Sequence, residues 1–146
     1  CDRTCRRNKT KKGIRNAIMK LDTVHHIAII GSNYENTREF YVEKLGFEQL
    51  DEHIRPEKKD ILFNVKKGNL VLEIFIKSDA PKRPVMPNPE HTGLRHLAFR
   101  VENVERCLSE FDAQGIRHEN VRTDDFDGKK MAFFFDPDGL PLEIHE

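Results

Sequence analysis

The order of hydrophobic and polar residues predicts a strand, a helix and three further strands in the first half of the chain. Residues 23–30 are rich in β-branched side chains, which favours a strand. Residues 33–45 carry apolar side chains near helical spacing and are followed by Gly46, a typical helix terminator. Three more strands are expected over residues 47–54, 60–65 and 69–76.

The same order of elements is predicted again after a proline-rich connector. Residues 78–93 contain four prolines, which exclude both a helix and a central strand. Beyond this connector we expect a strand over residues 94–101, a helix over 103–114 and strands over 116–121, 131–135 and 140–145. A unit of one strand, one helix and three strands therefore occurs twice, which indicates an internal duplication.

Matching motifs at equal spacing support this duplication. His26 and His96 each begin a His-aliphatic-Ala motif, and they lie 70 residues apart. Glu73 and Glu143 each lie within a Leu-Glu-Ile motif, and they are also 70 residues apart. Equal spacing at both ends of each unit makes a chance match improbable.

The alternation of side chains along a strand separates these four residues from the apolar positions. Successive residues of a strand point to opposite faces, so His26, Glu73, His96 and Glu143 lie opposite the aliphatic residues of their strands. The aliphatic faces can pack against the two helices, and the other faces then line a concavity. Two imidazoles and two carboxylates suit a divalent metal ion. The alternative is that each is a hydrogen-bonded or solvated residue of a half-exposed sheet.

Two further histidines lie next to these candidates. His25 precedes His26, so alternation turns it toward the helices or the rim, and we interpret it as a structural residue. His145 shares the face of Glu143 and is a candidate for contacts around a metal ligand, although its position near the end of the sequence favours exposure to solvent.

Composition and charge exclude several classes of function. The chain has 146 residues, with 25 basic and 25 acidic side chains. Seven of the basic residues and one acidic residue lie in residues 1–18, which leaves 18 basic and 24 acidic residues, a net charge of −6, in the remainder. Nucleic-acid binding is disfavoured because it requires clustered positive charge. No apolar run approaches the roughly 20 residues of a membrane span.

The basic segment of residues 1–18 is expected to be a solvated, disordered tail, and residues 19–146 are expected to form one domain. The alternatives for the tail are an arm that binds an anionic partner, or a role of Cys1 and Cys5 in metal binding or in a bridge to another chain. Beyond the tail only Cys107 remains, on an apolar helical stripe, so we expect it to be packed without a disulfide bond. A core without disulfides suggests a reducing, cytoplasmic location.

Residues 22–146 resemble the glyoxalase, or vicinal oxygen chelate, superfamily. The motifs that carry the likeness are His26-Ile-Ala-Ile, Leu72-Glu-Ile, His96-Leu-Ala-Phe and Asp136-Pro-Asp-Gly-Leu-Pro-Leu-Glu143, with Arg38-Glu-Phe-Tyr and Leu45-Gly-Phe between them. The resemblance implies an α+β fold of two tandem βαβββ modules that form a cupped, partly closed mixed sheet with the helices outside. The modules would span residues 22–77 and 94–146.

The resemblance also implies a metal site and a reaction. The ligand order of His26, Glu73, His96 and Glu143 is similar to that of bacterial glyoxalase I (lactoylglutathione lyase), which implies one divalent ion such as Ni²⁺, Zn²⁺ or Co²⁺, or else Mn²⁺ or Fe²⁺. The implied activity is that of a lyase or isomerase acting on a small molecule, a 2-oxoaldehyde–thiol adduct or a related α-hydroxycarbonyl, through a metal-bound enediolate. Glu143, in preference to Glu73, would move the proton, and the protein would be a homodimer.

Two positions differ from glyoxalase I and keep other functions open. Positions where that enzyme has an Arg and an Asn that help to bind glutathione hold Ile30 and Lys77 here, so the thiol is not identified. One alternative is a thiol transferase that acts on an epoxide antibiotic, although such relatives use three protein ligands. The other is a metal-free module that binds a small molecule, as the bleomycin-binding relatives do.

Overall fold

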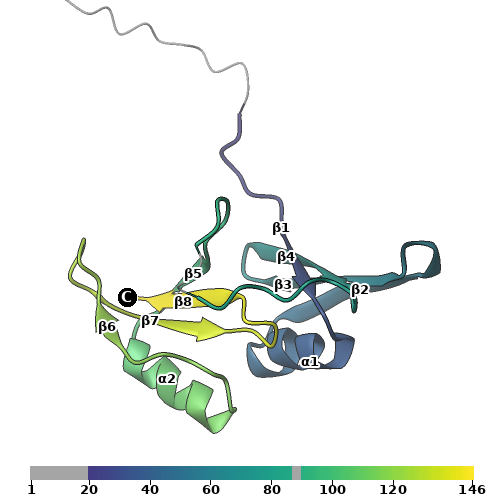
Figure 1. The fold of residues 1–146 in the computed structure, drawn as a ribbon. Helices are drawn as coiled ribbons and strands as arrows, with labels where there is room; N and C mark the ends of the chain where they lie inside the picture. The colour runs from purple at the N-terminus through teal and green to yellow at the C-terminus, as the bar shows by residue number, and fades with distance from the viewer. Residues whose placement is uncertain (1–19, 87–89) are drawn as a thin grey trace, which may run out of the picture.

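The computed structural model describes residues 20–86 and 90–146 (Figure 1). The predicted tail of residues 1–18 lies outside the described residues. Within the described part of the chain, no helix is long and apolar enough to cross a membrane.

The first module is a four-stranded sheet in the order β1-β4-β3-β2. Strand β1 (Ile27–Gly31) pairs in parallel with β4 (Leu70–Ile76), and β3 (Asp60–Lys67) pairs antiparallel with both β4 and β2 (Glu48–Arg55). A short α-helix, α1 (Tyr34–Arg38), continues as a π-helix, η1 (Glu39–Lys44), and a 3₁₀ turn, η2 (Pro56–Lys58), joins β2 to β3. Asn33 begins α1 by accepting a hydrogen bond from the Asn36 N–H group.

The second module repeats this arrangement in the order β5-β8-β7-β6. Its elements are β5 (Leu97–Arg100), α2 (Val104–Ala113), β6 (Arg122–Thr123), β7 (Lys130–Phe135) and β8 (Pro141–His145). The register confirms the duplication, because Ala28 is the partner of Glu73 in one sheet and Ala98 is the partner of Glu143 in the other. The predicted α+β fold of two βαβββ modules is thus confirmed.

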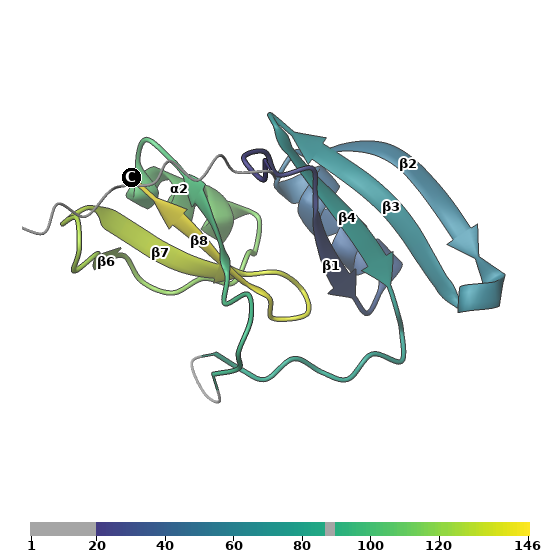
Figure 2. The same ribbon diagram turned by 90° about the horizontal axis from the view of Figure 1, so that it is seen from above.

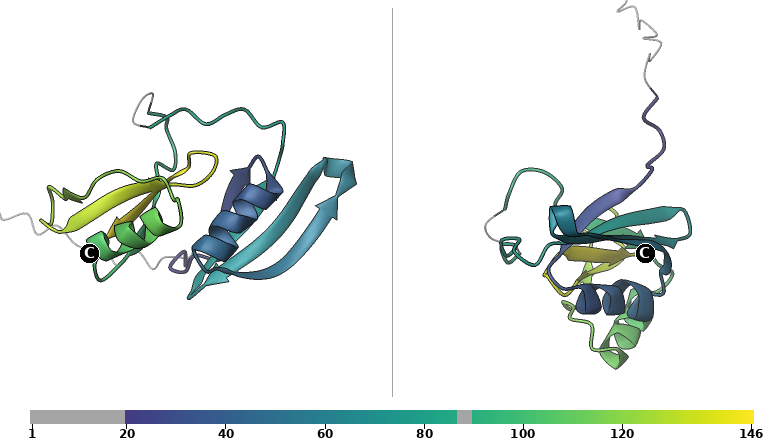
Figure 3. Two further views of the ribbon diagram at one scale, coloured as in Figure 1. Left: turned by 90° about the horizontal axis from the view of Figure 1, so that it is seen from below. Right: turned by 90° about the vertical axis from the view of Figure 1, so that its right-hand side faces the viewer.

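Both helices lie on one side of the two sheets, and the opposite faces of the sheets are left uncovered by helices (Figures 1 and 3). The apolar core lies between the helices and the sheets and continues from one module into the other. Phe134 of the second module illustrates this continuity: its ring centroid lies 4.6 Å from that of Phe111 and 6.4 Å from that of Phe40 in the first module. Cys107 packs against this core as a free thiol, as predicted.

The turn between β7 and β8 connects the modules through polar contacts. The Tyr41 hydroxyl donates a 2.9 Å hydrogen bond to Asp136 Oδ2, and both residues are buried. The Ser32 N–H and hydroxyl groups both donate to the carboxylate of Asp138. Residues 136–143, one of the motifs that carry the sequence resemblance, therefore also join the two modules. A cavity of about 940 Å³ lies between β1, the connector and β5.

Three strand predictions differ from the structure. Residues 23–26 and 94–96 are not in strands. In the register of each sheet, the positions opposite them lie at or before the first residues of β4 and β8, where pairing begins. The first residue of β8 is also a proline, which cannot donate a main-chain hydrogen bond. The strand predicted over residues 116–121 is replaced by a single bridge between His118 and Phe134, followed by the two-residue strand β6. Figure 2 shows the two sheets side by side, with the connector looping outside them.

Candidate metal centre

Each module contributes one His–Glu pair to the face of its sheet that the helices leave uncovered. In the first module, Glu73 lies in β4 beside Ala28, and His26 lies immediately before β1. His26 Nε2 is 3.3 Å from Glu73 Oε2. The two side chains are 41% and 26% exposed, so this pair is open to solvent.

The equivalent pair in the second module is more buried. His96 Nε2 is 2.9 Å from Glu143 Oε2, and the two side chains are 24% and 9% exposed. The imidazole of His96 packs edge-on against the ring of Phe133, with the centroids 5.1 Å apart. His96 Nδ1 is buried and has no hydrogen-bond partner among the described residues. A buried nitrogen without a partner is unfavourable, so the contacts of Nε2 and of the ring must hold His96 in this orientation at a cost.

The four predicted ligands form two pairs within one chain. In the described part of the chain, no three of His26, Glu73, His96 and Glu143 bring ligand atoms within 4.8 Å of one another. Two protein ligands are fewer than the three or four that a divalent metal of this type takes from a protein. The two pairs must therefore approach one another, within a chain or between chains, to form one four-ligand site.

His25, which was expected to face the helices or the rim, does not pack against the helices. Its side chain is exposed, and its Nδ1 lies 2.8 Å from Nδ1 of His26. The reason is that β1 begins at Ile27, so strict alternation does not apply to the two histidines. One of the two Nδ1 atoms must donate and the other accept, which couples the tautomer of His26 to that of His25.

A charged cluster that sequence reasoning missed lies at the far end of the first sheet. The Arg55 guanidinium donates two 2.7 Å hydrogen bonds to Asp60, and Lys77 Nζ donates a third of 2.7 Å. These contacts lower the pKa of Asp60 to about 2, and its side chain is fully buried. Arg55 also lies over the ring of Phe75, which shares the face of Glu73. The signal was available, because Arg55 and Asp60 flank the η2 turn and face each other in the β2–β3 register.

The family model described as the Glyoxalase/Bleomycin resistance protein/Dioxygenase superfamily matches residues 23–144. The uncharacterized protein YwkD of Bacillus subtilis is 45% identical over 129 residues, which cover 88% of this chain and 99% of that protein. A glyoxalase family protein of known structure from Enterococcus faecalis has a TM-score of 0.83 and 57% identity, over 88% of this chain and 100% of the other. A lactoylglutathione lyase from Schizosaccharomyces pombe is 27% identical over 84% of this chain and 44% of its own length. The chain belongs to the glyoxalase/bleomycin resistance/dioxygenase superfamily.

Proposed function

We propose that the protein is a metal-dependent lyase or isomerase of the glyoxalase I type. Its substrate class would be a 2-oxoaldehyde–thiol adduct or a related α-hydroxycarbonyl. The observation that carries the proposal is the pair of His–Glu contacts at the same register in both modules, 3.3 Å apart in one and 2.9 Å in the other. The likeness to a lactoylglutathione lyase supports the reaction class.

The donor set fits a divalent transition metal. Two imidazole nitrogens and two carboxylate oxygens suit Ni²⁺, Zn²⁺ or Co²⁺, and also Mn²⁺ or Fe²⁺. A bound ion would supply Lewis-acid stabilisation of the negative charge that develops on the substrate oxygens.

Glu143 is the proposed base, and Glu73 the proposed ligand and charge-balancing group. Glu143 is buried, with 7% of the whole residue exposed. Its partner in the neighbouring strand β7 is Phe133. A carboxylate at this position can act as a general base when a bound ion stabilises the negative charge that develops on the substrate oxygens. The side chain of Glu73 is more exposed, which suits a role in holding charge.

We further propose that two copies of the chain form a homodimer in which His26 and Glu73 of one copy meet His96 and Glu143 of the other. The separation of the two pairs within one chain supports this arrangement. So does the exposed face of β1, the edge strand of the first sheet, where Ile30 is 55% exposed and Ala28 is exposed as well. An exposed apolar surface of this kind is typical of an interface.

Mixed dimers test the proposal. One chain would carry His26→Ala and Glu73→Ala, and a second, differently tagged chain would carry His96→Ala and Glu143→Ala. If sites are shared between chains, the mixed dimer has one intact site and one without any of its four ligands. After tandem affinity purification and nickel loading, we expect one more ion per mixed dimer than in either parent dimer. Equal metal content in all three would contradict a shared site, and a monomer in light scattering would contradict the dimer.

A further inference from the structure

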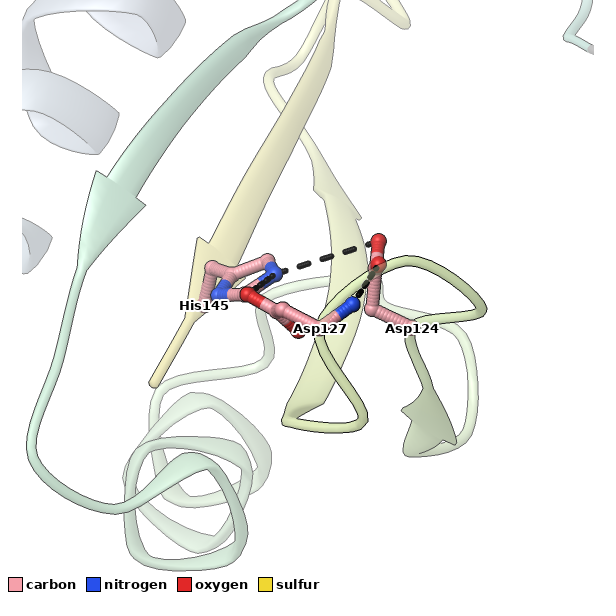
Figure 4. A group of neighbouring side chains, drawn as sticks. All are labelled: Asp124, Asp127 and His145. Atoms are coloured by element: carbon pink, nitrogen blue, oxygen red, sulfur yellow. Dashed lines mark hydrogen bonds and ion pairs between the residues drawn. The ribbon is translucent and has the colours of Figure 1, made fainter.

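A second group of metal-binding side chains lies away from the two His–Glu pairs. Asp124 and Asp127 belong to the loop between β6 and β7, and His145 is the last residue of β8. One ligand atom from each of these residues lies within 4.8 Å of the other two. Figure 4 shows the side chain of His145, from the end of β8, next to those of Asp124 and Asp127 from the loop. Sequence reasoning missed the two aspartates because their convergence with His145 depends on the path of this loop.

The main chain orients His145 so that Nε2 points at the two carboxylates. His145 Nδ1 lies 2.9 Å from the main-chain oxygen of Glu146, which can only accept, so Nδ1 carries a hydrogen. Glu146 is itself held, because its N–H group donates to Lys130 and its side chain accepts from Val104. Nε2, the other ring nitrogen, faces the carboxylates of Asp124 and Asp127. A metal-binding histidine typically presents one ring nitrogen to the ion while the other is hydrogen-bonded in this way.

Both carboxylates are held so that one oxygen stays free. Asp124 Oδ1 accepts hydrogen bonds from the Phe126 and Asp127 N–H groups, at 2.7 Å and 3.2 Å. These bonds keep the pKa of Asp124 below its ordinary value, so the group is ionised at neutral pH. Asp127 Oδ1 accepts a 2.9 Å hydrogen bond from the Lys129 N–H group. The remaining Oδ2 atoms of the two residues are the ones nearest to His145.

The distances between His145 and the two carboxylates suit ligands of one metal ion better than direct hydrogen bonds. His145 Nε2 is 3.5 Å from Asp127 Oδ2 and 3.9 Å from Asp124 Oδ2. Both separations exceed the 2.7–3.2 Å or so of a good N–H···O hydrogen bond. They are close to the spacing of about 3.4 Å between two ligand atoms that bind one tetrahedral ion with bonds of about 2.1 Å. Among the described residues, no Lys or Arg side chain lies within 4.0 Å of either carboxylate, so no permanent cation neutralises them.

We infer that Asp124, Asp127 and His145 form a second divalent metal site, which takes a transition ion such as Zn²⁺ or Mn²⁺. The imidazole ligand favours these ions over Ca²⁺ and Mg²⁺, which prefer oxygen alone. Because His145 is two residues from Glu143 on the same face of β8, an ion here would tie the loop of residues 124–128 to the end of the strand that carries Glu143. The inference is independent of the proposed function.

Zinc binding to the full chain tests this second site. The His26→Ala/His96→Ala variant, which lacks both histidines of the first site, is stripped with chelator, loaded with ZnCl₂ and desalted. We expect about one zinc per chain to remain, because the loop site is intact. Adding Asp127→Asn should weaken zinc binding at least about tenfold, because it removes a direct ligand. Loss of a residue that only supports a ligand already lowers metal affinity about tenfold or more. Zinc should also raise the melting temperature of the first variant and not of the second.

Asp125→Asn is the matched control, because it makes the same change of charge in the same loop outside the group. Zinc retained with Asp125→Asn and lost with Asp127→Asn supports the site. Equal zinc binding by these two variants, or no zinc in the folded His26→Ala/His96→Ala protein, would overturn it. If the double-histidine variant does not fold, Asp127→Asn in the otherwise unchanged chain must remove one zinc that Asp125→Asn keeps. If only the His–Glu site fails to bind metal, the result is different. In that case Asp127→Asn alone, in the otherwise unchanged chain, removes all zinc binding.

Discussion

The hydroxyl of Tyr41 donates a 2.9 Å hydrogen bond to Asp136 across a separation of 95 residues, and both groups are buried. Burial raises the pKa of Asp136, and it raises the pKa of Tyr41 well above its ordinary value. Asp136 Oδ1 also accepts hydrogen bonds from the N–H groups of Asp138 and Leu140, which shape the turn before β8. The contact between modules and the placement of Glu143 therefore depend on the same carboxylate.

Replacing Tyr41 with Phe should destabilise the protein by about 1–3 kcal/mol, because it leaves a buried carboxylate without one of its donors. Urea unfolding followed by circular dichroism measures this change. Tyr34→Phe is the control, since Tyr34 packs edge-on against Phe63 but is only half-buried, and its effect should stay within about 0.5 kcal/mol. Equal destabilisation by the two variants would contradict the importance assigned to the Tyr41–Asp136 contact.

Acid should remove the stabilisation that Asp60 provides. Its hydrogen bonds from Arg55 and Lys77 lower its pKa from 3.8 to about 2 in the folded protein. A carboxyl group with a lowered pKa stabilises the fold above its unfolded pKa, and the effect is lost as the pH falls through the folded value. The difference in melting temperature between wild type and Asp60→Asn should therefore be constant near pH 5–7 and shrink between about pH 4 and 2. A difference that does not change over this range would contradict the assignment.

The two adjacent histidines should differ in their effect on metal affinity. His26→Ala removes a proposed ligand and should abolish tight binding at the His–Glu site. His25→Ala removes only a neighbour, whose Nδ1 lies 2.8 Å from that of His26. We therefore expect metal affinity to fall about tenfold, the smallest effect typical of a residue that supports a metal ligand. Competition with a metal indicator dye measures both. If His25→Ala abolishes binding and His26→Ala retains it, the assignment of faces is wrong by one residue.

The two glutamates should separate turnover from metal content. Glu143→Gln keeps an oxygen that can coordinate but cannot accept a proton, so turnover should fall by ~10²–10⁴-fold while metal is largely retained. Glu73→Gln should reduce turnover less, because Glu73 is proposed to be chiefly a ligand. The measurement is solvent exchange of the acidic C–H proton in an α-hydroxycarbonyl substrate, alongside metal analysis. Wild-type rates in both metal-loaded variants would exclude either carboxylate as the base.

The repeated unit and its faces were predictable from sequence because they depend on local patterns. The spacing of His26 and His96, and of Glu73 and Glu143, reflects a register that the two sheets share, with Ala28 beside Glu73 and Ala98 beside Glu143. The predicted strand boundaries were wrong where a strand depends on a neighbouring strand for its hydrogen bonds. The first strand starts four residues later than predicted, and β4, which begins at Leu70, offers no position opposite residues 23 and 24.

The arrangement of the site was less predictable, because it depends on contacts between distant segments. The alternation of side chains placed Glu73 and Glu143 on the sheet faces that lie away from the helices. No local pattern predicts the distance between the His26–Glu73 pair of one module and the His96–Glu143 pair of the other. The same limit applies to Asp124 and Asp127, whose free oxygens are aimed at His145 by the N–H groups of the loop. Arg55 and Asp60 are the exception, since a hairpin pairing of β2 and β3 places them opposite each other.

The most direct test of the central claim is the metal content of the His–Glu site, measured in the Asp127→Asn background so that the loop group does not contribute. Protein stripped with chelator and reloaded with Ni²⁺, Co²⁺ or Zn²⁺ is desalted and analysed by mass spectrometry of the metal. We predict one ion per chain when His26, Glu73, His96 and Glu143 are intact, and none after either His26→Ala or His96→Ala. No bound metal in the intact protein, or undiminished metal after both substitutions, would contradict the claim.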